Sequence, residues 1–192
     1  MNTKIPRIVI AGTGSGSGKT TITCAILQAL VNRKLCVSAQ KCGPDYIDSM
    51  FHCRIIGAKC SNLDSFFFDE NTLKYLLQKN SKDCDVSVIE GVMGFYDGIS
   101  MSSVKASTHE IAIITKSPVL LVVDAKGASR SVLAVIHGFL SFFPDNQICG
   151  VILNRCTLGT YNVLASEIEK RFENKVKPLG FLPTLSDCTV ES

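Results

Sequence analysis

Short apolar runs alternate along the chain with longer segments of helical periodicity. The short runs are rich in β-branched residues, which is typical of strands buried in a sheet, whereas the longer segments repeat apolar residues every three or four positions. We therefore predict strands at 7–12, 35–40, 85–91, 118–125 and 147–155, a last strand or extended exit at 176–183, and helices at 19–33, 71–79, 129–143 and 160–173.

The repeated order of strand and helix is the pattern of βαβ units. Such units place their strands in a mostly parallel sheet with helices on both faces, which predicts an α/β fold. The run 118–125 is almost wholly apolar, as expected of a strand that is covered on both faces. Ligands in such folds bind at the carboxyl ends of the strands, so polar residues that directly follow a predicted strand are the candidates for a site.

The sequence GTGSGSGKTT, residues 12–21, follows the first predicted strand and leads directly into a predicted helix. Small residues allow backbone N–H groups to surround phosphate oxygens, and the N-terminus of the helix adds a partial positive charge. Lys19 supplies a full positive charge, and the Thr20 hydroxyl is placed to bind Mg²⁺. The strict Walker motif has glycine where this chain has Thr13, and Gly12 lies one position early, so the loop is a variant.

This loop predicts binding of a nucleoside triphosphate, since a glycine-rich turn with an incidental lysine would rarely stand between a strand and a helix in this order. The residues expected around the nucleotide are Thr13, Gly14, Ser15, Gly16, Ser17, Gly18, Lys19, Thr20 and Thr21.

Acidic side chains follow other predicted strands. Mg²⁺ carried by a triphosphate prefers one or two carboxylates beside hydroxyl, water and phosphate oxygens. Asp45 and Glu90 are the candidate ligands, together with Thr20. Asp124, at the end of 118–125, is a weaker candidate, because an acid at a strand end also serves as a helix cap or a solvated turn.

Other polar residues leave predicted strands at the same edge. Lys41 is placed to neutralise charge on a transferring phosphoryl group, or is a surface lysine. Asn154 is placed to read the edge of the base, and a turn-forming asparagine is an equal alternative. Asp45 and Asp48 are three positions apart, so both face the phosphate edge if a short helix starts there. His52 follows them, within reach of a substrate carboxylate, and we assign it no metal role.

Composition adds limits to this picture. The 192 residues, 46% hydrophobic and 19% charged, are enough for one globular domain. The net charge of +3 gives no reason to expect nucleic acid or a membrane surface as a partner. The nine cysteines form no C-x-x-C pair, and the N-terminus has no apolar signal core. We therefore expect a reduced, cytoplasmic compartment with most cysteines buried as small hydrophobes.

Several segments resemble one known family. AGTGSGSGKTT, QKCGPDYIDSMFH, SNLDSFF, VIEGVMGFYDG, PVLLVVDAKG and GVILNR are similar to the N-terminal domain of cobyrinic acid a,c-diamide synthase, from about residue 5 to about residue 183. The patterns K-x-GPDYID and EGVMG-x-YDG are highly specific. The wider group is similar to dethiobiotin synthetase and cobyric acid synthase, which share the variant phosphate loop.

The resemblance implies an ATP-dependent amide ligase with a P-loop fold like that of dethiobiotin synthetase. In the family, ATP phosphorylates the a and c carboxylates of the corrinoid cobyrinic acid, and ammonia converts each acyl phosphate into an amide. The implied cofactors are ATP and Mg²⁺, with the metal ion held by Thr20, Asp45 and Glu90. The residues implied to orient the substrate carboxylate or the transferring phosphoryl group are Lys41, Tyr46, Asp48 and Asp97.

Family members also carry a C-terminal glutaminase domain that releases ammonia from glutamine. We expect an ATP-binding amidoligase domain at 1–183 and the start of a linker at 184–192. Ammonia then comes from glutamine through a domain that is not in this chain, or from elsewhere. The residues leave open whether the domain forms a homodimer.

Three alternatives remain on the same scaffold. Nickel sirohydrochlorin a,c-diamide synthase has very similar motifs and differs in the macrocycle. Dethiobiotin synthetase is disfavoured by the GPDYID segment. A partitioning-type ATPase switch often has an extra lysine early in the phosphate loop, where this chain has Thr13 or Gly14.

Overall fold

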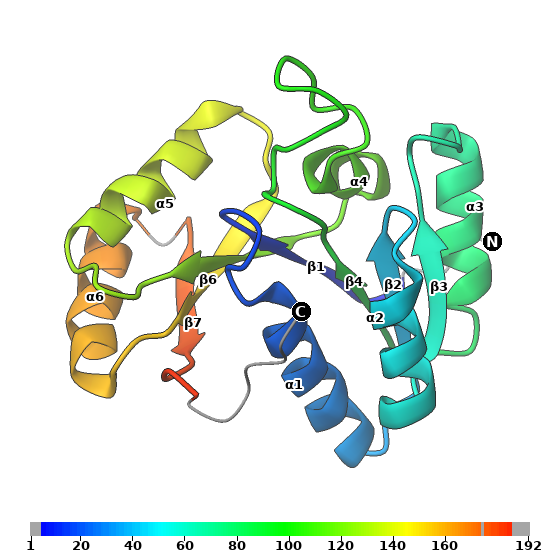
Figure 1. Cartoon of the computed structure of the whole chain (residues 1–192), viewed down its shortest axis with the longest axis horizontal. Helices are drawn as coiled ribbons and strands as arrows, with labels where there is room; N and C mark the ends of the chain where they lie inside the picture. The colour runs from blue at the N-terminus through cyan, green and yellow to red at the C-terminus, as the bar shows by residue number, and fades with distance from the viewer. Residues whose placement is uncertain (1–4, 174, 186–192) are drawn as a thin grey trace.

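The computed structural model describes residues 5–173 and 175–185, and its strands lie side by side in one sheet that is flanked by helices (Figure 1). The elements are β1 (Arg7–Gly12), α1 (Lys19–Asn32), β2 (Val37–Cys42), α2 (Tyr46–Phe51), the π-helical turn η1 (His52–Ile56), β3 (Lys59–Leu63), α3 (Glu70–Asn80), β4 (Val86–Glu90), α4 (Thr108–Thr115), β5 (Val119–Asp124), α5 (Ser131–Phe142), β6 (Ile148–Asn154), α6 (Leu158–Arg171) and β7 (Lys177–Phe181).

The sheet has seven strands in the order β3-β2-β4-β1-β5-β6-β7, and each of these neighbouring pairs is parallel. The carboxyl ends of all these strands therefore meet at one edge. This arrangement confirms the predicted α/β fold with a parallel sheet.

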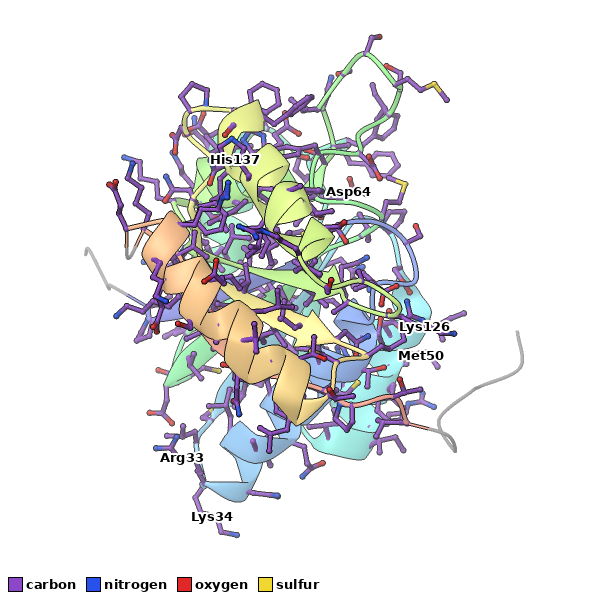
Figure 2. The ribbon with its side chains drawn as sticks, turned by 90° about the vertical axis from the view of Figure 1, so that its left-hand side faces the viewer. Arg33, Lys34, Met50, Asp64, Lys126 and His137 are labelled. Atoms are coloured by element: carbon purple, nitrogen blue, oxygen red, sulfur yellow. The ribbon has the colours of Figure 1, made fainter. Side chains whose placement is uncertain are left out.

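Successive residues of the central strands point to opposite faces of the sheet. On β5, Leu120 and Val122 belong to one hydrophobic cluster, whereas Leu121 and Val123 belong to a second. The first cluster lies under α1 and η1, and the second lies under α3, α4, α5 and α6. Figure 2 shows the two layers edge-on, with His137 of α5 on one side of the sheet and Arg33, which follows α1, on the other.

Three elements of the described residues, β3, α4 and the turn η1, have no counterpart among the predicted elements. β3 was not predicted because its sequence KCSNL has no alternation of apolar and polar residues, and Leu63 alone is fully buried in it. α4 was not predicted as an element either, since its sequence THEIAIIT is rich in β-branched residues, which favour strands. The helix forms because Ser107 Oγ caps its first turn by accepting from the Glu110 N–H at 3.1 Å, and because Ile111 and Ala112 pack into the core.

The expectation that most cysteines are buried is wrong for the described part of the chain. Eight free cysteines are described, of which only Cys42 and Cys156 are buried, while Cys53 and Cys149 are exposed. The ninth, Cys188, and most of the segment 184–192 lie outside the described residues. Among the helices of the described residues, none has both the length and the apolar character that crossing a membrane requires.

Candidate functional site

The loop between β1 and α1 forms the first part of the site. Gly16 and Gly18 have φ angles of 71° and 96°, in the left-handed region that favours glycine. α1 begins at Lys19, and no side chain caps its first turn. The backbone N–H groups at this end have no partner within the helix, so they are suited to bind an anion. The residues predicted at the nucleotide, Thr13 to Thr21, thus lie in one loop and one helical turn.

The end of β6 braces this loop. Asn154 Nδ2 donates to the Ser17 carbonyl at 2.9 Å, and Arg155 Nη2 donates to the Gly16 carbonyl at 3.4 Å. Arg155 also forms an ion pair with Asp124 and thereby lowers the pKa of that carboxyl group. Asp124 is therefore engaged on this side of the loop and does not join the other acids.

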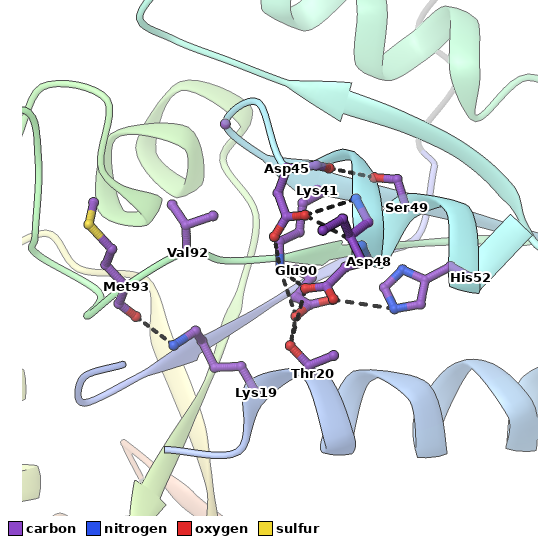
Figure 3. Close-up of polar contacts among 12 residues, drawn as sticks. Lys19, Thr20, Lys41, Asp45, Asp48, Ser49, His52, Glu90, Val92 and Met93 are labelled. Atoms are coloured by element: carbon purple, nitrogen blue, oxygen red, sulfur yellow. Dashed lines mark hydrogen bonds and ion pairs between the residues drawn. The ribbon is translucent and has the colours of Figure 1, made fainter. Parts of the chain in front are cut away.

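Lys19 is nearly buried and bonds to backbone on both sides. Its Nζ donates to the Met93 carbonyl at 2.6 Å (Figure 3) and also to the Gly14 carbonyl at 3.0 Å. Burial lowers the pKa of Lys19, and the nearby charge of Lys41 lowers it further. Asp97 lies in the same loop as Met93, where its Oδ2 accepts from the Gly94 N–H at 2.8 Å. The negative charge of Asp97 partly opposes the lowering of the Lys19 pKa.

Lys41 stands at the centre of a group of acids. Its Nζ lies 2.6 Å from Asp48 Oδ2, 2.8 Å from Glu90 Oε1 and 3.5 Å from Asp45 Oδ2. The side chains of Lys41 and Glu90 are only 4% and 1% exposed. Burial alone would lower the pKa of Lys41, but Glu90 and Asp48 outweigh it and raise that pKa, so the ammonium stays charged.

Strand register creates this group and joins it to the phosphate loop. Lys41 of β2 is in register with Glu90 of β4, so both side chains rise from the same face of the sheet. Thr20, in the first turn of α1, places its Oγ1 2.6 Å from Glu90 Oε1 and 3.3 Å from Asp48 Oδ2. Predicted residues from three separate segments therefore meet at one point.

The short helix on which the joint role of Asp45 and Asp48 depended is present as α2 (Tyr46–Phe51). Asp45 caps it, with its Oδ1 accepting from the N–H groups of Ile47 at 3.1 Å and of Asp48 at 3.4 Å. One carboxylate oxygen of Asp45 thus holds the helix, and the other faces Lys41. The side chain of Tyr46, which was also predicted in the site, lies outside the described residues.

His52 lies at the back of the group. Its Nε2 is 3.4 Å from Glu90 Oε2, and its side chain is 2% exposed. Burial lowers the pKa of His52. Neither His52 Nε2 nor Glu90 Oε2 has a hydrogen-bond partner among the described residues. The sequence indicated His52 as a site residue only through its position after GPDYID. Its burial beside Glu90 depends on tertiary packing, which the sequence pattern does not show.

These residues fit a Mg²⁺ ion that arrives with phosphate. Such an ion takes few ligands from the protein, and the Thr20 hydroxyl, the Asp45 and Asp48 carboxylates and Glu90 Oε1, which lies 2.6 Å from Thr20 Oγ1, offer the hard oxygen atoms that it prefers. An all-protein centre is a different matter, because the described residues contain no group of three or more His, Cys, Asp or Glu placed to hold a metal ion.

Comparison with known proteins identifies the family of the chain. Residues 8–189 match the family model described as the CobQ/CobB/MinD/ParA nucleotide binding domain. The chain is 46% identical over 178 residues to cobyrinate a,c-diamide synthase of Listeria innocua, which covers 92% of this chain and 39% of that protein. It is 44% identical over 163 residues to hydrogenobyrinate a,c-diamide synthase of Streptomyces coelicolor, which covers 85% of this chain and 34% of that protein.

Solved structures share the fold at low sequence identity. The signal recognition particle receptor FtsY of Elizabethkingia anophelis, in complex with GDP, superimposes with a TM-score of 0.67 at 14% identity, over 93% of this chain and 57% of that chain. This likeness shows the fold alone. The chain spans about two fifths of the length of the Listeria synthase. By sequence, the chain belongs to the CobQ/CobB/MinD/ParA family of nucleotide-binding domains, and its relatives include cobyrinate a,c-diamide synthases.

Proposed function

We propose that this domain binds ATP with Mg²⁺ and activates a side-chain carboxylate of a corrinoid, cobyrinic acid or a near relative, for conversion into an amide. The observation that carries the proposal is the buried ammonium of Lys41, held among three carboxylates directly beside the phosphate loop. The names of the relatives support this substrate class, and the role proposed for the reaction is in cobalamin biosynthesis.

The proposed reaction has two steps. A carboxylate oxygen of the substrate first bonds to the γ-phosphorus of ATP, and the bond from that phosphorus to the β,γ-bridging oxygen breaks, releasing ADP. Ammonia then bonds to the carbonyl carbon of the acyl phosphate, inorganic phosphate leaves, and the ammonia nitrogen loses a proton to water. The first step is needed because a carboxylate cannot expel oxide, whereas an acyl phosphate readily expels phosphate.

The main task of the protein is to bring two anions together. Lys19 and Lys41, which are both buried, provide positive charge beside the phosphate loop. The Mg²⁺ ion, held by Thr20, Asp45 and Glu90, would supply further neutralisation of the phosphate charge. Asp48 contacts both Lys41 and Thr20, so it is suited to orient the lysine toward the transferring group.

The other predicted residues take supporting roles in this proposal. Asp97, in the loop that contacts Lys19, and Tyr46, at the start of α2, orient the substrate carboxylate. Asn154 reads the base edge in addition to bracing the loop. Ammonia comes from glutamine through a glutaminase domain outside this chain, which fits the greater length of the relatives.

Amide formation by this chain tests the proposal. The chain is incubated with ATP, Mg²⁺, ammonium and cobyrinic acid, and mass spectrometry follows the replacement of carboxyl groups by amides. Hydrogenobyrinic acid, nickel sirohydrochlorin and diaminopelargonic acid, tested in parallel, separate the alternative ligases. ATP hydrolysis that rises with a protein partner and ignores every corrinoid would instead identify an ATPase switch.

The variant Asp45→Asn tests the role of the Asp45 charge without disturbing the fold. Asparagine caps a helix as well as aspartate does, so α2 should persist while the charge toward Lys41 is lost. We expect an unchanged circular dichroism spectrum and a loss of amide formation.

A further inference from the structure

Asn62 is a polar residue on β3 for which the proposed reaction has no role. It is in register with Lys41 of β2, which is itself in register with Glu90 of β4. The three residues form a row across neighbouring parallel strands, and their side chains rise from the same face of the sheet. Asn62 therefore lies directly beside Lys41, on the side opposite to Glu90.

The carboxamide of Asn62 is bonded to the segment that enters α2. Its Nδ2 donates to the Gly43 carbonyl at 2.8 Å and to the Asp45 carbonyl at 3.0 Å. Ser49 Oγ lies 3.3 Å from Asn62 Oδ1 and 3.1 Å from the Asp45 carbonyl, so the Ser49 proton is shared between these two acceptors (Figure 3 shows the bond to Asp45). Both ends of the amide are thus used.

α2 needs such support from outside. It has six residues, and a helix of this length is not stable in water by itself. The segment before it turns at Gly43, whose φ is 70° and whose N–H donates to the Leu63 carbonyl at 2.9 Å. β3 therefore holds the start of α2 through its backbone at Leu63 and through the side chain of Asn62.

We propose that Asn62 is a positioning residue, whose carboxamide fixes the entry of α2 and thereby sets Asp45 and Asp48 against Lys41. Its effect on the reaction rests on the proposed function, whereas its effect on α2 does not. Asn62 makes no contact with Lys41, Thr20 or the phosphate loop among the hydrogen bonds of the described residues, so it acts through α2 alone.

Asn146 offers a matched control at a remote position. Its Nδ2 also donates to two carbonyls, those of Leu140 at 3.1 Å and Phe143 at 2.8 Å, and its Oδ1 accepts from the Ile148 N–H at 3.0 Å. It closes the turn between α5 and β6, away from α2. Replacing either asparagine by aspartate removes two donors and places a carboxylate against two carbonyl oxygens.

Hydrogen exchange tests the clamp without any substrate. In Asn62→Asp, we expect the amides of 47–51 to exchange at least about tenfold faster than in the wild type, because the entry of α2 opens more often. Asn146→Asp should leave these amides unchanged. Ser49→Ala removes only the contacts of the Ser49 hydroxyl and should leave the overall fold intact. We expect it to speed up the exchange of the same amides by a smaller factor. Wild-type exchange at 47–51 in both Asn62→Asp and Ser49→Ala would overturn the proposal.

Steady-state kinetics test the link to the reaction. With ammonium and cobyrinic acid, Asn62→Asp should lower kcat about 10- to 100-fold, because a small misplacement of reacting groups has effects of this size. The KM for ATP should change by a smaller factor than kcat, since the phosphate loop itself is not touched although the proposed Mg²⁺ ligand Asp45 moves. An equal loss in Asn146→Asp, or an unchanged kcat in Asn62→Asp, would contradict the positioning role. An inactive wild type would instead count against the proposed function, and exchange would still decide the clamp.

Discussion

Lys41 and Glu90 are the residues whose burial matters most. An ammonium that is 4% exposed and a carboxylate that is 1% exposed persist together because each satisfies the other. Removing one partner from such a pair leaves an uncompensated charge in a region of low polarity, which is strongly unfavourable. We therefore expect the pair to contribute strongly to the stability of this edge of the sheet.

Lys41→Met should lower the free energy of unfolding by about 3–5 kcal/mol, because it strands the carboxylate of Glu90. Glu90→Gln should also destabilise, since it leaves the ammonium with only Asp48 and Asp45. The double variant should lose clearly less than the sum of the two single variants. Urea unfolding of the four proteins measures this coupling, and strict additivity would show that the two side chains act independently.

Asp48 gives the site a pH dependence. Burial alone would raise the pKa of Asp48, but hydrogen bonds from Lys41 and Thr20 outweigh it, so the folded-state pKa lies below the ordinary value. Its contribution to stability is then complete above the unfolded pKa of about 4 and disappears as the pH falls through the folded pKa.

Asp48→Asn should therefore be less stable than the wild type at pH 7, and the difference should shrink as the pH falls below about 4. Urea midpoints at a series of pH values measure the difference between the two proteins. A difference that stays constant down to the acid limit of folding would mean that the lost contact is not the charged one.

Among the elements, the phosphate loop is held in shape by β6. Gly18 has a φ of 96°, and a Cβ atom built there would lie 2.1 Å from Asn154 Nδ2. A side chain at this position would both strain the backbone and push away the asparagine that holds Ser17. The close approach explains why glycine stands directly before Lys19.

Gly18→Ala should weaken ATP binding by at least about tenfold, which corresponds to about 1.4 kcal/mol. Titration with a fluorescent ATP analogue measures the dissociation constant. Gly138→Ala, on α5 with open space around the added methyl group, serves as the control and should bind like the wild type. Equal affinities in all three proteins would show that the loop tolerates another shape.

Local patterns in the sequence predicted the elements that have strong local signals. The phosphate loop, α1 and the apolar strand β5 are of this kind, whereas the spacing of Asp45 and Asp48 was only compatible with the short helix α2 and did not predict it. β3 has no such signal, because as an edge strand it carries mostly polar residues. The role of Asn62 could not be predicted either, since its partners are brought near by the pairing of β3 with β2.

At the scale of the whole molecule, the sheet order β3-β2-β4-β1 assembles the site. Three residues that are far apart in the sequence meet at this edge. They are Thr20 in the first turn of α1, Lys41 near the end of β2 and Glu90 at the end of β4. Sequence patterns place each of them after a strand, but only strand order and register decide which of them touch. This dependence on nonlocal pairing also explains why Asp124, at the end of β5, is turned to Arg155 instead.

The central claim is that this edge transfers a phosphoryl group from ATP to a carboxylate. It can be tested with cobyrinic acid that carries ¹⁸O in its carboxyl groups, incubated with this chain, ATP, Mg²⁺ and ammonium. If an acyl phosphate forms, each inorganic phosphate released with an amide carries one ¹⁸O atom from the substrate. Phosphate that contains only unlabelled oxygen would show that ATP is hydrolysed by water, and would contradict carboxylate activation at this site.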